Sequence, residues 1–539
     1  MMIALLAILL IAMMLRMVAL QRSHNIAKES TVYLHMAMDF TRQPPREIAR
    51  SYHYHPGYSG LLAVLATPQR QKNLEEWIDD GSLISLVMSL ACLVAIFDIS
   101  RDTFGPLAAV FATLAAAISG PFIELSVEVL SDVTAAACAL GAIALALRMR
   151  AAGILGKRTM LIHAAFVGLL AGLAYLTRPE ALISAAVGFG VLAWLGKRRI
   201  HWKLSLAATL IMLAVLLVCV VPYATTVGGL TAKKGVSDFV GVEQSVLLAE
   251  AARPMRLLNA MVKTLDRTRA AIGSPMAFLI IIWVLTWFGR YLLRMRLPKK
   301  VLVMPRRRGA LVIWLVFGAL FVIVTALEYN RGPYISSRHM LIPGLLLAST
   351  AGAGLVILGQ WLTIIVRRYG KTMRQRRGLS IAALIYVTLA LIAAFPAVHE
   401  GKRYLRRAGR EVLAAAGPNR YVLDPDGRVA FFARAPGRQF RENGGMPNEY
   451  WKKHLISTDQ LYRLATSRTT AYEVLVVHSD DVEEGPNRSI LAELMEDPRF
   501  ELIEVVGGTR PLDVPAESLP QTVRDKQVWL FRILTPRPS

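Results

Sequence analysis

Residues 204–223, LSLAATLIMLAVLLVCVVPY, form one uninterrupted apolar run, and the stretch just before them, KRRIHWK at 197–203, carries four Lys and Arg. A helix rises about 1.5 Å per residue, so a run of about 20 apolar residues matches the hydrocarbon thickness of a bilayer. Basic loops beside such runs remain on the cytoplasmic side. The stretch therefore predicts a transmembrane helix that starts inside and ends outside.

Apolar runs of similar length recur up to residue 397. Hydrophobic residues make up 54% of the 539-residue chain and charged residues only 19%, whereas soluble domains usually carry about 25% charged residues. A single soluble core also stops growing near ~250–300 residues. We therefore predict about eleven transmembrane helices, near 2–20, 82–97, 104–122, 129–147, 160–176, 180–196, 204–223, 274–293, 309–327, 340–361 and 378–397.

The basic residues are concentrated in alternate loops. With the N-terminus placed inside, the inner loops 98–103, 148–158, 197–203, 290–308 and 367–377 hold 23 Lys and Arg but only two acids. These loops account for +21 of the net charge of +24, as the positive-inside rule requires. The sequence thus predicts a multi-pass plasma (inner) membrane protein with a cytoplasmic N-terminus, and it argues against a nucleic-acid partner.

The chain divides by hydropathy into two predicted domains. Residues 1–397 form a transmembrane domain with two long outer loops, 21–81 and 224–273, and residues 398–539 form a soluble domain. Long loops in a compact protein are usually functional. The expected fold is an α-helical polytopic membrane protein with a small extracytoplasmic α/β domain at its C-terminus.

The soluble domain shows alternating apolar and helical patterns. Short apolar runs predict strands, and periodic stretches such as 405–416 and 488–496 predict helices. The predicted strands lie at 421–423, 429–432, 474–477 and 528–531. The domain contains neither a Gly-rich phosphate loop nor a nucleophile elbow. Acceptor binding and shielding of the membrane face both remain open as its role.

Charged and aromatic residues from five separate stretches are predicted to meet at the outer membrane surface. Ionisable residues near a membrane are costly, which makes them candidates for function. Glu29 and Tyr33 lie four residues apart and would share one face of a helix. The candidates are Glu29 with Tyr33, His55 with Tyr58, Asp132, Arg178 with Glu180, and Tyr329, Arg331, Tyr334 and Arg338.

This combination of side chains suits group transfer from a lipid phosphate. A carboxylate beside an acceptor hydroxyl can act as general base, and arginines can bind a phosphate bidentately and stabilise it as it leaves. Each residue taken singly also has an ordinary interpretation. These are snorkelling for Arg178 and Arg338, an aromatic belt for Tyr58 and Tyr334, an ion pair for Asp132 and a helix-end charge for Glu29.

Four local motifs and their order carry a family resemblance. They are KESTVY at 28–33, HPGY at 55–58, LSD at 130–132 and GLAYLTRP at 172–179, with SSRH at 336–339 as a further match. Together they cover most of residues 1–400. The chain resembles the GT-C superfamily of integral-membrane glycosyltransferases, in particular the family-39-like branch with protein O-mannosyltransferases and the lipid A aminoarabinose transferase.

The resemblance implies an inverting transfer of a sugar from a polyprenyl-phosphate donor to a lipid, glycan or protein acceptor at the outer face. It implies a carboxylate general base, expected at Glu29 or Asp132. The expected donor-phosphate ligands are Arg178, Arg338 and His55, and the expected substrate contacts are Tyr33, Tyr58, Tyr329, Arg331 and Tyr334.

One position departs from the family pattern. Lys28 stands where the family usually has the first acid of a pair. Either Glu29 alone carries the base role, or Asp132 or Asp39 takes it, or the chemistry differs. No ligand set has diagnostic metal spacing, so no cofactor is certain and a divalent metal stays open.

Two other classes of function compete with a glycosyltransferase. A transporter or flippase of a polyprenyl-linked glycan would carry polar residues in the middle of several spans, whereas the candidates here gather at one surface. A non-catalytic membrane scaffold would not need loop 21–81 and the arginines to converge.

Overall fold

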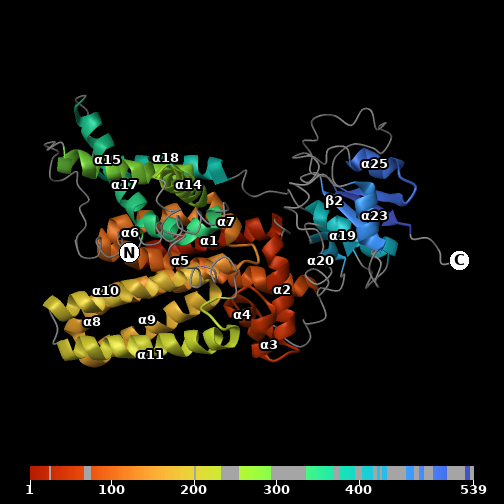
Figure 1. Ribbon diagram of the computed structural model, residues 1–539. Coiled ribbons are helices and arrows are strands. Elements are labelled where there is room, and N and C mark those ends of the chain that lie inside the picture. The colour runs from red at the N-terminus through yellow and green to blue at the C-terminus, as the bar shows by residue number, and fades with distance from the viewer. Residues whose placement is uncertain are drawn as a thin grey trace. The chain divides into compact units, whose positions relative to one another are not determined.

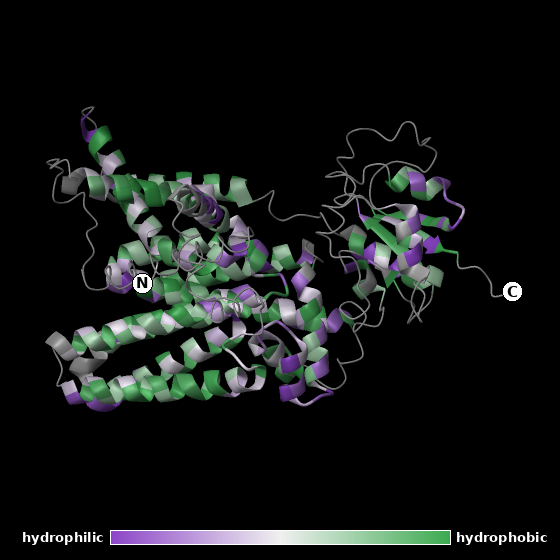
Figure 2. Ribbon diagram, viewed as in Figure 1, coloured by the Kyte–Doolittle hydropathy of each residue, from purple (hydrophilic) through white to green (hydrophobic). Residues whose placement is uncertain are grey.

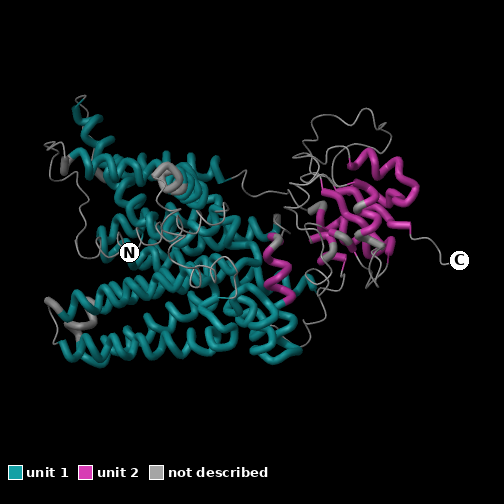
Figure 3. The backbone as a smooth tube through the Cα atoms, in the orientation of Figure 1, with its two compact units in different colours: residues 1–21, 36–398 teal, residues 22–35, 399–539 magenta. Residues whose placement is uncertain are grey.

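The computed structural model describes residues 1–22, 26–65, 74–198, 202–231, 254–292, 318, 336–368, 375–394, 403–416, 422–424, 428–433, 457–466, 473–478, 490–506 and 528–534. The chain forms two compact units (Figure 3). The first comprises Met1–Gln21 and Met36–Val398, and the second comprises Arg22–His35 and His399–Ser539. Helix α2 (Lys28–Phe40) contributes residues to both units.

The first unit is a bundle of mostly apolar helices (Figures 1 and 2). Its helices are α1 (Met2–Arg22), α3 (Pro45–Ser51), α4 (Gly57–Leu65), α5 (Leu74–Thr103), α6 (Pro106–Ala117), α7 (Gly120–Leu125), α8 (Ser131–Leu155), α9 (Lys157–Thr177), η2 (Pro179–Leu182), α10 (Ile183–Arg198), α11 (Trp202–Val227), α14 (Pro254–Ile272), α15 (Ser274–Leu292), η4 (Ser337–Met340), α17 (Leu341–Arg368) and α18 (Gln375–Ala394). Helices α8 to α11 lie side by side.

The described residues contain eight helices that are long and apolar enough to cross a membrane. The count rises to nine if α14 and α15, which are bent by 119° at Gly273, form one span. The chain is therefore a multi-pass membrane protein. The predicted span 309–327 falls outside the described residues apart from Gly318, so the expected number of about eleven stays a prediction.

The run predicted as a single span at 104–122 differs in the structure. Helix α6 ends at Ala117 after 12 residues, and the short helix α7 begins at Gly120. Pro121 explains the break, because proline has no N–H to continue the helix to the carbonyl of Ala117.

Helix α17 is the central helix of the first unit. Of its apolar window 89% is buried, against 28% for α1 and α11. Glycines allow the close approach of its neighbours, because a Cβ at Gly352 would lie 2.3 Å from the carbonyl oxygen of Ala108, and one at Gly354 would lie 2.1 Å from that of Leu279. Small residues at helix contacts are typical of membrane bundles.

The second unit contains a four-stranded sheet with the order β1-β2-β4-β3. Strands β1 (Val422–Leu423) and β2 (Val474–His478) are parallel, and β4 (Val528–Ile533) is antiparallel to both β2 and β3 (Phe500–Val506). The helices are α19 (Arg403–Ala416), α20 (Arg428–Phe432), α23 (Thr458–Thr466) and α25 (Ile490–Glu496). The expectation of an α/β domain is confirmed.

Apolar residues cover both faces of this sheet. Successive residues of a strand point to opposite faces, and in β2 Leu475 and Val477 pack with α25, whereas Val474 and Val476 pack with α19. The predicted strand at 429–432 is wrong, because these residues form helix α20. Val429 and Ala433, four apart, pack against α19, and periodicity alone cannot separate helix from strand in so short a run.

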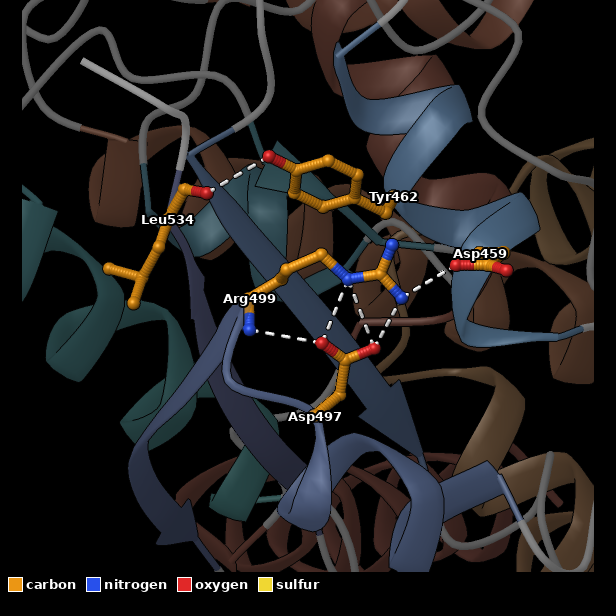
Figure 4. Close-up of polar contacts among 5 residues, drawn as sticks. All are labelled: Asp459, Tyr462, Asp497, Arg499 and Leu534. Atoms are coloured by element: carbon orange, nitrogen blue, oxygen red, sulfur yellow. Dashed lines mark hydrogen bonds and ion pairs between the residues drawn. The ribbon is translucent and has the colours of Figure 1, made fainter.

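A charged network closes one end of the sheet (Figure 4). The guanidinium of Arg499 binds both carboxylate oxygens of Asp497, and Nη2 also lies 2.7 Å from Asp459. The guanidinium carbon of Arg499 lies 4.8 Å from the ring centroid of Tyr462. The Tyr462 hydroxyl donates to the carbonyl of Leu534 at 3.2 Å. The network joins α23 to the turn before β3 and to the end of β4.

Candidate functional site

A buried ion-pair cluster lies where α8 begins and α9 ends, here called the site end of the first unit. Nη2 of Arg178 lies 2.8 Å from Oδ1 of Asp132, and Nη1 donates to Oε1 of Glu180 at 2.9 Å. Nε donates to Oγ of Ser131 at 3.4 Å. The side chains of Arg178, Asp132 and Glu180 are only 12%, 1% and 12% exposed. The cluster joins the predicted LSD and GLAYLTRP motifs.

Local sequence fixes the position of Arg178. Pro179 disfavours a helical conformation at the residue before it, and Arg178 is extended, with φ −149° and ψ 125°. The α9 helix therefore ends at Thr177, and the guanidinium turns toward the first turn of α8. Asp132 lies in that first turn, where the helix dipole favours a negative charge.

The Asp132 carboxylate forms an ion pair with Arg178. Oδ1 is close enough to Arg178 for an ion pair, but neither oxygen accepts a well-aligned hydrogen bond from the described residues. The short distance is enough for a strong attraction, because the Coulomb energy of two buried charges depends on their separation and only weakly on hydrogen-bond angle. The pairing interpretation raised for Asp132 thus matches the geometry.

His55 lies in an aromatic pocket against the end of α9. Its Nε2 is 3.0 Å from Oγ1 of Thr231, and its ring centroid is 5.2 Å from that of Tyr175 and 4.6 Å from that of Tyr223. The hydroxyl of Tyr175 donates to the carbonyl of Leu230. His55 is 2% exposed. This packing brings the HPGY motif beside α9, the helix that Arg178 directly follows.

The next residues of the HPGY motif, Gly57 and Tyr58, pack α4 closely against α9 and α5. A Cβ at Gly57 would lie 2.7 Å from the backbone carbonyl of Leu176, so only glycine fits there without displacement. The hydroxyl of Tyr58 donates to the carbonyl of Gly81 in α5 at 2.9 Å, and the side chain is fully buried. Burial raises the pKa of Tyr58 well above its ordinary value, which keeps the hydroxyl a neutral donor.

The remaining predicted residues lie elsewhere. Arg338 is on η4, which is capped by Ser336 and packs against α14. Glu29 and Tyr33 are on the part of α2 that belongs to the second unit. Asp39, on the same helix but in the first unit, accepts a hydrogen bond from Tyr52 at 2.7 Å. Tyr329, Arg331 and Tyr334 lie outside the described residues.

Sequence reasoning missed a cavity of about 270 Å³ at the site end. It lies between the α6–α7 break, the turn from α14 to α15, and α18. Its polar lining residues include Ser119, Arg269, Ser274 and Tyr386. The Gly273-Ser274-Pro275 turn, with φ +80° at Gly273, was the sequence signal for this bend. The described residues contain no group of three or more potential metal ligands.

Solved structures of other proteins share this fold. ArnT from Cupriavidus metallidurans in the apo state matches with a TM-score of 0.58 at 14% identity, covering 97% of both chains. The same protein bound to undecaprenyl phosphate matches at 0.55 and 15%, again over 97% of both. Archaeoglobus fulgidus oligosaccharyltransferase AglB, in complex with an inhibitory peptide and a dolichol-phosphate, matches at 0.56 and 13%, over 88% of this chain and 69% of AglB. The chain has the fold of the GT-C membrane glycosyltransferases.

A family match points to the same class. Residues 78–224 match the family described as dolichyl-phosphate-mannose-protein mannosyltransferase. This region runs from α5 to α11 and contains both Asp132 and Arg178. No curated protein sequence matches the chain. The resemblance to the GT-C superfamily is thus confirmed.

Proposed function

We propose that the protein is a membrane glycosyltransferase that moves a sugar from a polyprenyl-phosphate donor to an acceptor at the extracytoplasmic face of the membrane. The buried Arg178 cluster is the observation that carries the proposal, because it fixes a guanidinium at one end of an apolar helix bundle. Support comes from the GT-C fold and from the undecaprenyl phosphate and dolichol-phosphate bound by ArnT and AglB.

The proposed reaction is a single displacement with inversion. A carboxylate takes the proton of the acceptor hydroxyl, the acceptor oxygen forms a bond to the anomeric carbon, and the bond from that carbon to the phosphate oxygen breaks. Polyprenyl phosphate leaves with the electron pair. Arg178, Arg338 and His55 are the proposed groups that hold the phosphate and its developing charge.

The two candidate carboxylates differ in their surroundings. Asp132 is 2% exposed and lies within ion-pair distance of Arg178, whereas Glu29 is partly exposed in the first turn of α2. We assign the base to Glu29, because a general base must reach the acceptor. Asp132 then orients Arg178. A guanidinium has five N–H donors, enough to bind two carboxylates and a phosphate together.

Tyrosines and a further arginine are proposed to contact the substrates. They are Tyr33, Tyr329, Arg331 and Tyr334. Because Tyr58 is fully buried and bonded to α5, its contribution would act through the placement of the HPGY segment. The proposed acceptor is a hydroxyl of a lipid, a glycan or a protein.

The test is transfer from a radiolabelled polyprenyl-phosphate sugar by purified protein in liposomes. Glu29→Gln and Arg178→Ala are expected to lower the rate at least about 100-fold, since each removes a group that acts on developing charge or on the transferred proton. Full activity in both variants would refute these assignments.

Arg148→Ala is the matched control. Arg148 lies in the second half of α8 and pairs with Asp98 near the C-terminal end of α5, away from the site end. Its removal therefore also breaks an Arg–Asp pair of the same bundle. We expect this variant to retain near wild-type transfer. An equal loss in Arg148→Ala and Arg178→Ala would show a general effect of broken ion pairs.

A further inference from the structure

A fully buried arginine lies within α1. The Arg16 side chain is 0% exposed, and it sits six residues before the end of the helix, about 9 Å along its axis. A charge in the apolar part of a span is costly and is usually functional. In the described residues its polar contacts are neutral: Nε donates to Ser89 at 2.8 Å, and Nη1 donates to the carbonyls of Ala12 and Ala117 at 3.1 Å each.

The contact with Ala117 falls on the α6–α7 break. In a continuous helix the carbonyl of Ala117 would accept from the N–H of residue 121, but that residue is Pro121. The guanidinium of Arg16 therefore provides the hydrogen bond that the break removes. It also lies 5.0 Å from the ring centroid of Phe122 in α7, so it contacts both sides of the break.

The opposite side of the break is fixed by another element. Oγ of Ser119 donates to the carbonyl of Ile272 at 2.9 Å, at the turn between α14 and α15. Apolar packing of Ala19 with Ile123 and Val127 adds to the α1 contact. The break, which forms one wall of the 270 Å³ cavity, is thus held between α1 and the α14–α15 turn.

The chain from the break to Asp132 is short and internally bonded. Ser126 N–H donates to the carbonyl of Phe122, Val127 N–H to that of Glu124, and Leu130 N–H to that of Glu128. Residues 125 to 136 are all buried. A displacement at the break would therefore be passed to the start of α8, where Asp132 meets Arg178.

We infer that Arg16 is a positioning residue of the transferase, which holds the α6–α7 break and through it the Asp132–Arg178 pair. The inference rests on the proposed function. Arg16 contacts neither member of the pair in the described structure. Stability alone accounts poorly for this arginine, since burying a guanidinium among neutral partners is costly and Nη2 has no hydrogen-bond partner among the described residues.

The test compares Arg16→Met and Arg16→Lys with the wild type in the liposome transfer assay. We expect Arg16→Met to lower kcat about 10- to 100-fold, with the donor KM changed less than about threefold, because small misplacements of reacting groups act on the chemical step. Arg16→Lys should recover part of kcat, since its ammonium can still donate to the carbonyl of Ala117. Ser89→Ala, which leaves that carbonyl contact in place, is the control and should lose less.

Hydrogen exchange of the full chain provides a readout independent of activity. In Arg16→Met we expect faster exchange in peptides from 118–130 and unchanged exchange in α17. Unchanged exchange at 118–130, or wild-type kcat in Arg16→Met, would overturn the inference. Faster exchange throughout the chain would overturn it too, in favour of a role in general stability. If the wild type itself transfers no sugar, the proposed function fails, and the exchange result still tests the link from Arg16 to the break.

Discussion

At the scale of single residues, neighbours along the chain determine what a charged side chain can do. Arg178 faces Asp132 because Pro179 ends the preceding helix, and Arg16 has an acceptor because Pro121 removes a backbone donor. The sequence motifs predicted that His55, Asp132 and Arg178 would lie at one end of the bundle. The partners of His55 could not be predicted, because Thr231 and Tyr223 approach it from a distant helix and its loop.

The Arg499 network yields a pH prediction. Hydrogen bonds from Arg499 lower the pKa of Asp497 to about 2, below the ordinary value of about 4. A lowered folded-state pKa stabilises the fold fully above pH ~4, and the contribution is lost as pH falls toward ~2. We expect Arg499→Gln to unfold at lower temperature than wild type at pH 6, and we expect this difference to shrink between pH ~4 and pH ~2, where Asp497 becomes protonated.

Thermal unfolding of the purified full chain, followed by tryptophan fluorescence, checks this pH dependence. The control is Arg532→Gln, whose single exposed pair with Glu501 should contribute about 0–1 kcal/mol at any of these pH values. A wild-type to Arg499→Gln difference that is as large at pH 2.5 as at pH 6 would contradict the assignment.

At the scale of elements, hydropathy located helices better than it located their breaks. The run 104–122 is apolar throughout, so counting apolar residues predicted one span, whereas the structure divides it at residues 118–119. Gly120-Pro121 was the local signal of the break, and a proline in a helix of a membrane protein can also produce a mere kink. The cavity depends on three elements far apart in sequence, which no local pattern reports.

The close approach of α4 to α9 can be tested with a pair of glycines. Gly57→Ala would place a Cβ 2.7 Å from the backbone of Leu176, whereas a Cβ at Gly60 would meet nothing within 4 Å. Since backbone atoms cannot move aside cheaply, we expect Gly57→Ala to destabilise the protein by about 1–3 kcal/mol. Gly60→Ala should be neutral or slightly stabilising. The unfolding temperatures of the purified variants measure both effects, and equal temperatures would show that the approach is looser than described.

At the scale of the whole molecule, the charge of the loops predicts an orientation. The basic loops 148–158 and 367–377 are expected in the cytoplasm, and the C-terminal unit outside. The test uses single cysteines at exposed positions, Arg158→Cys and Ala415→Cys. A membrane-impermeant maleimide should label Ala415→Cys in intact cells and Arg158→Cys only after permeabilisation. The reverse pattern would invert the topology and place the site end in the cytoplasm. The wild type, whose Cys92 and Cys138 are buried, gives the background.

The central claim is that this helix bundle breaks the bond between a sugar and a polyprenyl phosphate. The most direct measurement follows the donor and the product in liposomes that contain the purified wild type, a polyprenyl-phosphate sugar and an acceptor. The account predicts one free polyprenyl phosphate for each sugar transferred, and a product whose anomeric configuration, read by NMR, is opposite to that of the donor. Donor that crosses the bilayer intact, or donor that stays unchanged with every acceptor class, would contradict it.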